Sequence, residues 1–178
     1  MKKNPNTPIK NPTASAKLTR GLRNNNPFNI RRSASKWSGK IPFEKSTDKQ
    51  YEQFETVRHG IRAGLYLLTK YVLTHGLDTI PKIIHRWAPN GDGKNNEALY
   101  VQAVMSYNSI CSHVQQSTDW LFKMAAGMCR VESNYVLTRS VFESAFHGLP
   151  LGYMAYWKKF AGDGFCQAHA GEEEVGLC

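Results

Sequence analysis

Long apolar runs are absent from this 178-residue sequence. The longest apolar stretch, residues 65–73, is interrupted by Thr69 and Lys70, whereas a membrane-spanning helix needs about 20 apolar residues. The basic first residues are not followed by the apolar segment of a secretory signal peptide. We therefore expect no membrane span and synthesis in the cytoplasm. If the protein acts outside its producer, something other than a simple N-terminal signal must carry it there.

Complete sets of metal ligands are also missing. The four cysteines form no Cys-x-x-Cys pair, and Cys166 with His169 has a ligand-like spacing but supplies only two ligands. The loop at residues 90–96 resembles a calcium loop, but Lys94 stands at a ligand position and no glutamate follows at the required distance. We therefore expect neither a metal nor another cofactor.

Acidic residues are lacking in the first 40 positions, which contain ten of the 23 lysines and arginines. Residues 1–18 combine this charge with three prolines and almost nothing to bury, so we expect a disordered basic arm. Such an arm suits an anionic cell envelope, an acidic protein or nucleic acid. Nucleic acid is the least favoured partner, because no aromatic residue precedes Phe28 and no nucleic-acid-binding motif is present.

Periodic patterns begin after residue 18 and indicate one mainly α-helical domain over residues 19–160. Closely spaced aromatic and apolar residues before residue 55 predict a small β-ribbon, with turns at Gly39 and residues 45–49. Helical periodicity then predicts helices at about residues 56–76, 78–88, 97–107, 117–135, 139–146 and 151–160. Gly60 and Gly64, four positions apart in the first helix, would allow another segment to approach it closely.

The C-terminal residues 161–178 are rich in glycine and glutamate, and we expect an irregular tail there. A disulfide between Cys166 and Cys178, or between Cys111 and Cys166, is open if the protein reaches an oxidising space. Cys129 lies inside a predicted helix and fits a small core residue.

One carboxylate closes an apolar helical stripe. Within the predicted helix at residues 117–135, one face carries Leu121, Ala125, Met128 and Glu132 at steps of four, three and four. Burial there would disfavour the ionised form and raise the pKa of Glu132, as a general acid near neutral pH requires. Periodicity alone favours the plainer interpretation, a solvated glutamate at the edge of the helix.

The segment at residues 20–31, Arg-Gly-Leu-Arg-Asn-Asn-Asn-Pro-Phe-Asn-Ile-Arg, resembles the opening of a family found in phages, prophages and bacteria. Members of that family are often described as virion structural proteins. The similarity covers about residues 20–135 and continues in residues 47–54, 60–71, 76–80 and 83–89. Phe28 departs from the family, which usually has glycine there, and so does the longer cysteine-bearing C-terminal part.

The same family resembles, more distantly, the lysozyme-like glucosaminidases and lytic transglycosylases. Residues 25–30, Asn-Asn-Pro-Phe-Asn-Ile, are similar to a glucosaminidase segment that precedes a β-hairpin and a helix. Residues 128–135, Met-Cys-Arg-Val-Glu-Ser-Asn-Tyr, are similar to a transglycosylase segment whose glutamate ends a buried helix and is the catalytic acid. In those enzymes the two segments occur in the opposite order. The resemblance therefore implies a lysozyme-like helical domain that is circularly permuted, which proteins tolerate where chain ends lie close together.

This resemblance implies peptidoglycan as the partner. Glu132 would protonate a glycosidic oxygen, and in a hydrolase a second carboxylate would act as base or stabiliser. Candidates for the second carboxylate lie on the predicted ribbon, and Asp48 is preferred to Glu44, Glu52 and Glu55. A lytic transglycosylase needs no second acid, because the 6-hydroxyl of the sugar itself closes the product.

Other residues would hold the sugars. The resemblance implies that four polar side chains bind the substrate: Asn25, Asn26, Asn29 and Tyr135. Trp37 or Trp87 could stack on a sugar ring. Asn25 and Asn26 fit a purely turn-building role equally well, and Trp87 fits core packing better than sugar stacking.

The expected function is thus that of a peptidoglycan-degrading glycosidase: a muramidase, a glucosaminidase or a lytic transglycosylase. It would serve as a phage lysin, carried in a virion, or as an antibacterial effector delivered to a target cell envelope by a machine such as type VI secretion. We favour the effector, because a lone domain follows a basic arm; an effector implies an immunity protein that plugs the cleft. The alternative is a non-enzymatic virion structural module, or a module that binds the envelope or nucleic acid.

Overall fold

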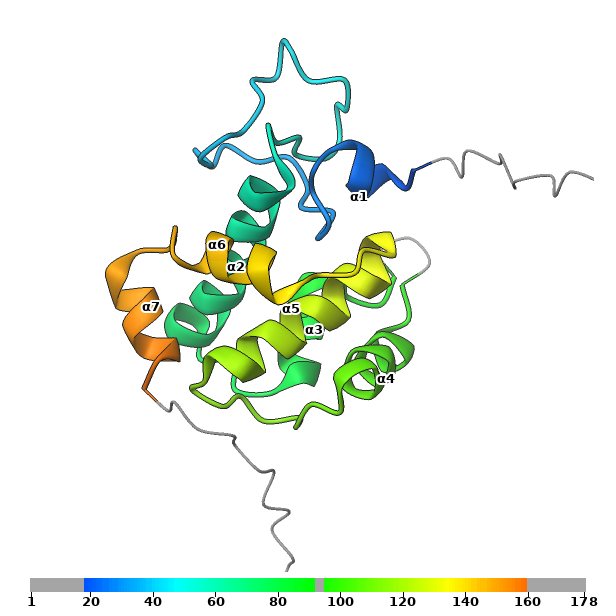
Figure 1. The fold of residues 1–178 in the computed structure, drawn as a ribbon. Helices are drawn as coiled ribbons and strands as arrows, with labels where there is room; N and C mark the ends of the chain where they lie inside the picture. Colours follow the sequence, from blue (N-terminus) through cyan, green and yellow to red (C-terminus); the bar gives the residue numbers. More distant parts are fainter. Residues whose placement is uncertain (1–17, 92–94, 160–178) are drawn as a thin grey trace, which may run out of the picture.

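The computed structural model describes residues 18–91 and 95–159. Within these residues the fold is mainly α, as predicted, and Figure 1 shows its helices: α1 (Arg20–Arg23), α2 (Val57–His75), α3 (Ile80–Trp87), α4 (Glu97–Asn108), α5 (Thr118–Ser133), α6 (Arg139–Phe146) and α7 (Leu151–Trp157). The short α1 is not among the predicted helices. Residues 1–17, 92–94 and 160–178, which hold most of the predicted arm, part of the calcium-like loop and the predicted tail, lie outside the described residues.

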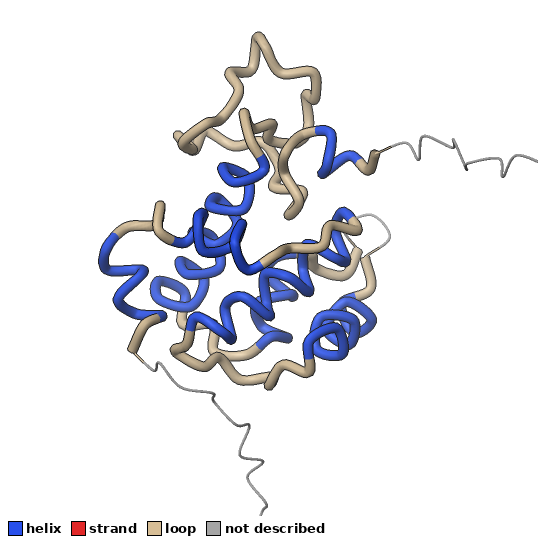
Figure 2. The backbone as a smooth tube through the Cα atoms, viewed as in Figure 1, coloured by secondary structure: helices blue, strands red, loops and turns tan. Residues whose placement is uncertain are grey.

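The predicted β-ribbon is present only as isolated antiparallel bridges, Arg31 with Tyr51 and Lys40 with Phe54, and Figure 2 shows this region as loop. Residues 50–55 run between two other segments. Gln50 and Glu52 form backbone bonds with residues 30–32, Gln53 and Glu55 with residues 39–41, and Phe54 with Asn24. Side chains complete the pairing, since the buried amide of Asn26 donates to the backbone oxygens of Ile30 and Glu52. Because each neighbouring segment supplies so few backbone bonds, no regular ladder forms among the described residues.

Helix α2 packs tightly against residues 25–28 through two of its glycines. This confirms the prediction that another segment approaches this helix closely at Gly60 and Gly64. A Cβ atom at Gly60 would lie 2.0 Å from the backbone oxygen of Asn25, and one at Gly64 would lie 2.2 Å from the ring of Phe28. Phe28 is fully buried. Residues 25–28 are therefore pressed onto α2, and the loop that follows them is positioned by that helix.

Helix α5 forms the centre of the core. Ser117 caps its N-terminus by accepting from the backbone N–H of Trp120, and Asn134 ends it in the left-handed conformation with φ of 57°. Apart from Lys123, every residue from Trp120 to Cys129 is buried or half-buried without charge, and α5 packs against α1, α2 and α4. Gly127 brings α4 close, because a Cβ atom there would lie 3.0 Å from the side chain of Val104.

Two absences can be stated for the described ranges. No helix in residues 18–91 or 95–159 is both long enough and apolar enough to cross a membrane. The same residues contain no group of three or more histidine, cysteine or acidic side chains arranged to hold a metal ion. Cys111 takes part in a disulfide, whereas Cys129 is a free and buried thiol, as expected of a core residue.

Candidate active site

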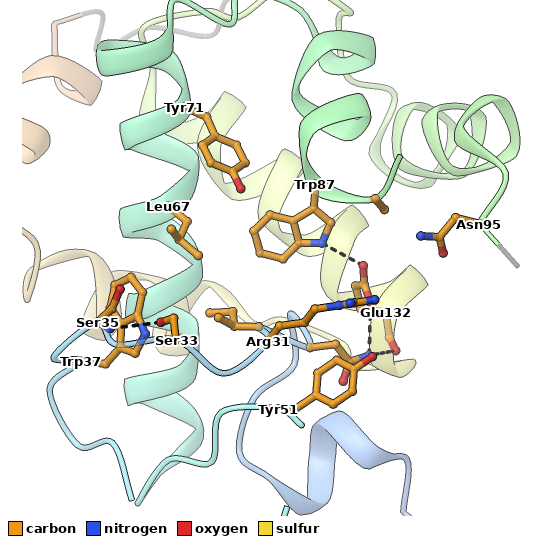
Figure 3. Close-up of a pocket in the computed structure, with 13 residues that line it drawn as sticks. Arg31, Ser33, Ser35, Trp37, Tyr51, Leu67, Tyr71, Trp87, Asn95 and Glu132 are labelled. Carbon is orange, nitrogen blue, oxygen red and sulfur yellow. Dashed lines mark hydrogen bonds between the residues drawn. The ribbon is translucent and has the colours of Figure 1, made fainter. Parts of the chain in front are cut away.

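Glu132 lies in the last turn of α5, and three side chains donate hydrogen bonds to its carboxyl group; Figure 3 shows the one from Trp87. Its Oε1 atom accepts from the Nε1–H of Trp87 at 2.9 Å and from the hydroxyl of Tyr100 at 2.8 Å. Its Oε2 atom accepts the longer bond, 3.2 Å, from the Nδ2 of Asn29. Two good donors occupy the lone pairs of Oε1, so Oε2 is the oxygen with room for a proton or a further partner.

Helix ends bring these donors together. Trp87 is the last residue of α3, and Pro89 follows where the helix can no longer continue. Tyr100 lies in the first turn of α4, whose cap Asn96 accepts from the backbone N–H of Leu99 at 3.0 Å. The end of α3 and the start of α4 thus place the indole N–H of Trp87 and the hydroxyl of Tyr100 against the same carboxylate.

Asn29 is aimed at Glu132 by its backbone. Its φ of 50° lies in the left-handed region, which asparagine tolerates better than most residues. Its Nδ2 also donates to the backbone oxygen of Glu132 at 2.7 Å. Next to this contact the hydroxyl of Ser133 donates to the backbone oxygen of Pro27 at 2.8 Å. The hydroxyl of Thr19 donates to the backbone oxygen of Ser133 at 2.8 Å. The end of α5 is therefore fastened to the N-terminal segment.

Burial dominates the electrostatics of this site. Desolvation raises the pKa of Glu132, and the hydrogen bonds from Tyr100, Trp87 and Asn29 only partly oppose it. Burial and the nearby Glu132 carboxylate raise the pKa of Tyr100 well above its ordinary value, so this phenol is a donor and not an anion. The carboxyl group of Glu132 is thus set to hold its proton to a higher pH than an exposed glutamate.

A cleft of about 490 Å³ opens beside Glu132. Figure 3 shows Trp37 and Ser35 at one end of its lining and Glu132 at the other, with Arg31 between them and Leu67 and Tyr71 of α2 along one side. The complete lining is Asn29, Ile30, Arg31, Ser33, Ser35, Trp37, Tyr51, Leu67, Tyr71, Trp87, Ala88, Asn95 and Glu132. Among these described residues Glu132 is the only carboxylate. The cleft therefore combines one acid with aromatic and hydrogen-bonding side chains.

Three of the predicted site residues line the cleft together, namely Asn29, Trp37 and Glu132. Trp87 also lines it, although its indole serves the glutamate rather than a separate stacking platform. The predicted ligand Tyr135 does not line the cleft; it is half-buried and packs against the core.

Asn25 and Asn26 build the turn. The Nδ2 of Asn25 donates to the backbone oxygens of Phe54 and Glu55 at 3.0 and 3.2 Å. Asn26 is fully buried, and its Oδ1 accepts from the backbone N–H of Ile30 at 3.0 Å. Neither side chain lines the cleft, so both have the turn-building contacts that the sequence left as an alternative.

Asp48 does not meet Glu132 across the cleft. Its carboxylate accepts from the guanidinium of Arg20 at 2.6 and 3.1 Å and from the Nδ2 of Asn24 at 2.7 Å. Burial alone would raise the pKa of Asp48, but these bonds and the backbone N–H groups of Gln50 and Tyr51 outweigh it and hold the pKa well below its ordinary range. These contacts describe a carboxylate that fastens α1 to the following loop.

The other acidic candidates also lie away from the cleft lining. Glu52 is fully buried and pairs with the Nζ of Lys40 at 2.8 Å, and it accepts from the backbone N–H of Ser33 at 2.9 Å. Glu44 and Glu55 are exposed. The Glu52–Lys40 pair holds residues 33–35, because Lys40 also donates to the backbone oxygens of Ser33 and Ser35.

Sequence reasoning did not identify Tyr100, Tyr71 or Arg31 as site residues. In the sequence Tyr100 stands among the apolar residues of its helix, and its role depends on where α4 packs against α5. The sequence did contain one signal for this site. Trp87 and Tyr100, two aromatic residues that can each donate a hydrogen bond, stand on either side of one loop and could serve a buried carboxylate.

No protein-family model matches the chain. The chain is 32% identical over 145 residues to protein P5 of Pseudoalteromonas phage PM2, and the alignment covers 77% of this chain and 88% of that protein. The match says nothing of glucosaminidases or transglycosylases, and that more distant resemblance stays a prediction. On this identity and coverage, the chain belongs to the same family as the phage protein P5.

Proposed function

We propose that this protein is a peptidoglycan-cleaving glycosidase of the lytic transglycosylase type, with Glu132 as its acid. The observation that carries the proposal is the carboxyl group of Glu132, which burial keeps protonated to higher pH at the edge of a cleft of about 490 Å³. Trp37 and Glu132 line the same cleft, so a sugar ring stacked on Trp37 would share that cleft with a glycosidic bond near the acid.

The proposed reaction balances without a cofactor. Oε2 of Glu132 gives its proton to the glycosidic oxygen as the bond from that oxygen to C1 breaks. The 6-hydroxyl of the same sugar then attacks C1, and its proton returns to Glu132. The products are a chain with a free hydroxyl end and a chain with a 1,6-anhydro end. Trp87 and Tyr100 hold Oε1 throughout and stabilise the carboxylate at the stage when it is ionised.

No second acid lines the cleft among the described residues, and this favours a transglycosylase over a hydrolase. Glu132 is the only carboxylate among the described residues that line the cleft, and Asp48 is committed to Arg20 and Asn24. A hydrolase of the usual kind places a second carboxylate about 5–9 Å from the first. Intramolecular closure by the substrate's own hydroxyl needs no such group.

The contacts at the end of α5 support the permuted lysozyme-like fold. In the lysozyme-like enzymes the glutamate helix precedes the asparagine-rich segment, and here it follows that segment by about a hundred residues. In space the two still meet, because Ser133 contacts Pro27 and Thr19, and Asn29 contacts Glu132. This is the neighbourhood that a permutation at a surface loop would leave unchanged.

The phage relative supports a role in a phage over the exported effector that the sequence alone favoured. A wall-cleaving protein of a phage opens the envelope during entry or exit. Under this proposal an immunity protein is not needed, and the partner is the peptidoglycan itself.

A second candidate is a non-enzymatic structural or binding protein of a phage. Membership in the family of protein P5 favours this candidate more than it favours an enzyme, because the match is to a phage protein whose name specifies no activity. On this alternative the cleft binds a glycan or another phage component without cleaving it, and the Glu132 cluster is structural.

The deciding experiment is digestion of purified peptidoglycan by the wild type, by Glu132→Gln and by Glu143→Gln. Glu143 is an exposed residue of α6 that does not line the cleft, so it provides a matched control. Soluble fragments are quantified against time. We expect the wild type and Glu143→Gln to release fragments alike, and Glu132→Gln to be slower by about 10²–10⁴-fold.

Other outcomes decide against the proposal. Equal release by Glu132→Gln and the wild type would remove Glu132 from the reaction. If none of the three proteins releases fragments but all bind the insoluble wall, the binding alternative holds.

A further inference from the structure

A second cavity of about 350 Å³ adjoins the Glu132 cleft. Ser35, Trp37 and Leu67 line both cavities, so Trp37 and Leu67 form part of the wall between them. The ring of Trp37 is fixed by an edge-on contact with Tyr66, whose centroid lies 5.7 Å away. The two cavities are therefore neighbours, and a ligand that reaches from one to the other must pass beside Trp37.

The periodicity of α2 divides its side chains between the two cavities. Tyr71 lines only the Glu132 cleft, and Leu67, four positions earlier, lines both cavities. Arg62, Tyr66 and Lys70, also at steps of four, face the second cavity. One helix thus presents an apolar and aromatic row to the first cavity and a row with two cations to the second.

The second cavity is positively charged. Lys36 from the loop joins Arg62 and Lys70 in its lining, and no carboxylate lines it among the described residues. Lys36, Arg62 and Lys70 form no ion pair with a described acidic residue, whereas Lys40, Lys82 and Lys123 each pair with one. Arg62 is half-buried, so its charge is less screened than that of an exposed side chain. Three cations without local counter-charges create a field that favours an anion.

We propose that the second cavity binds a carboxylate group of a substrate whose sugar occupies the Glu132 cleft. This proposal rests on the proposed function and specifies its substrate as a glycan that carries acidic groups. Peptidoglycan bears carboxylates of two origins, the stem peptide and the lactyl group that is exposed when the peptide is removed. Chitin, which has the same kind of sugar backbone, bears none.

Binding is measured by titration calorimetry in the Glu132→Gln background, so that the ligand is not cleaved. The test variant adds Arg62→Gln and Lys70→Gln, and the control adds Lys45→Gln and Arg130→Gln. The test variant and the control each lose one lysine and one arginine charge. The two variants differ in position, because Lys45 and Arg130 are exposed and line neither cavity. Three probes are used: four-sugar peptidoglycan fragments with stem peptides, the same fragments after an amidase removes the peptides, and chitotetraose.

We expect the test variant to bind the peptide-bearing fragments about three- to tenfold more weakly than the control does. Chitotetraose should bind both within about twofold. If the loss persists after amidase treatment, the lactyl group is the recognised carboxylate; if it disappears, the stem peptide is. Thermal melting of both proteins checks their folding, and Lys70→Glu, a change at an exposed position, serves if the double substitution unfolds the chain.

An equal loss of affinity in test and control variants, or an equal loss for chitotetraose, overturns the carboxylate site. Absence of binding by every glycan overturns it as well. The proposed function fails in a different way, since a wild-type protein that releases no fragments while its binding still depends on Arg62 and Lys70 is a carboxylate-binding module without the reaction.

Discussion

Asn29 and Glu132 are 103 positions apart in sequence, and one amide group joins them through two hydrogen bonds. The Nδ2 of Asn29 lies 2.7 Å from the backbone oxygen of Glu132 and 3.2 Å from its Oε2 atom. The same side chain therefore fastens the end of α5 and touches the carboxyl oxygen that we propose as the proton donor. Several consequences of this arrangement can be measured.

Asn29→Gly should shift the pH dependence of the reaction. Glycine keeps the left-handed backbone and removes a hydrogen bond that lowers the pKa of Glu132, so that pKa should rise further. In the proposed reaction the protonated acid is the active form, so the alkaline limb of the pH–rate profile should move to higher pH. Asn25→Gly is the matched control, with φ of 51° and an amide that bonds away from the cleft. An unshifted limb in Asn29→Gly, or an equal shift in both variants, would contradict this.

Glu132→Gln should stabilise the fold at neutral pH. The folded-state pKa of Glu132 lies above its unfolded value, so its contribution to stability is fully present below the unfolded pKa and is lost as pH rises through the folded pKa. Glutamine cannot ionise and escapes this loss. The free energy of unfolding of the variant, relative to the wild type, should therefore increase between about pH 4 and about pH 7. Urea unfolding at both pH values tests this, with Glu143→Gln as control; a constant difference would show that Glu132 does not carry the shift.

Gly64→Ala should destabilise the protein by about 1–3 kcal/mol, because its Cβ would lie 2.2 Å from the ring of Phe28. In a Phe28→Ala background the ring is gone, and the same substitution should be neutral or stabilising by up to about 1 kcal/mol through helix propensity. Denaturant unfolding of the four proteins in this cycle measures the coupling. Gly152→Ala, in α7, serves as the control for propensity, because a Cβ atom there would have no neighbour within 4 Å. Additive effects of Gly64→Ala and Phe28→Ala would rule out the contact.

Asp48→Asn should lower stability and leave peptidoglycan cleavage intact. The substitution removes acceptors for Asn24 and Arg20, and we expect a loss of about 1–2 kcal/mol at neutral pH, limited because Arg20 is 42% exposed. The pKa of Asp48 is lowered in the fold, so its contribution is present above the unfolded pKa and should fade as pH falls through the acidic range. Asp78→Asn, at an exposed pair with Lys82, is the control and should change little. Loss of cleavage with unchanged stability would return Asp48 to the reaction.

Most of the helices could be predicted from the sequence because they have a start or a stop signal of their own; the short α1 has no side-chain cap and was missed. Thr56, Thr79 and Ser117 cap three of them, and Gly76 ends the longest with φ of 63°. Gly60 and Gly64 of α2 also predicted that another segment would pack closely on this helix, and the structure shows that residues 25–28 do so. The closely spaced aromatic residues predicted a β-ribbon, but only isolated bridges form there. Part of the pairing comes from side chains, such as the amide of Asn26 that donates to the backbone oxygen of Glu52.

The site could be predicted only in part. Glu132 stood out because an acid at the end of an apolar stripe must be either solvated or held by donors, and the structure shows the donors. The sequence did not show that no other carboxylate among the described residues would line the cleft. Asp48 lies in a family-like segment, yet its partners Arg20 and Asn24 are 28 and 24 residues away and only the fold brings them to it. The role of Tyr100 could not be predicted for the same reason, because only the packing of α4 against α5 brings its hydroxyl to Glu132.

The most direct measurement is the mass of the fragments released from purified peptidoglycan in water enriched in ¹⁸O. A lone acid with closure by the sugar's own hydroxyl predicts fragments with anhydro ends and no ¹⁸O from the wild type, and almost none from Glu132→Gln. Reducing ends that carry ¹⁸O would contradict the single-acid mechanism. Equal release by Glu132→Gln, or no release by the wild type, would contradict the central claim that Glu132 cleaves the wall.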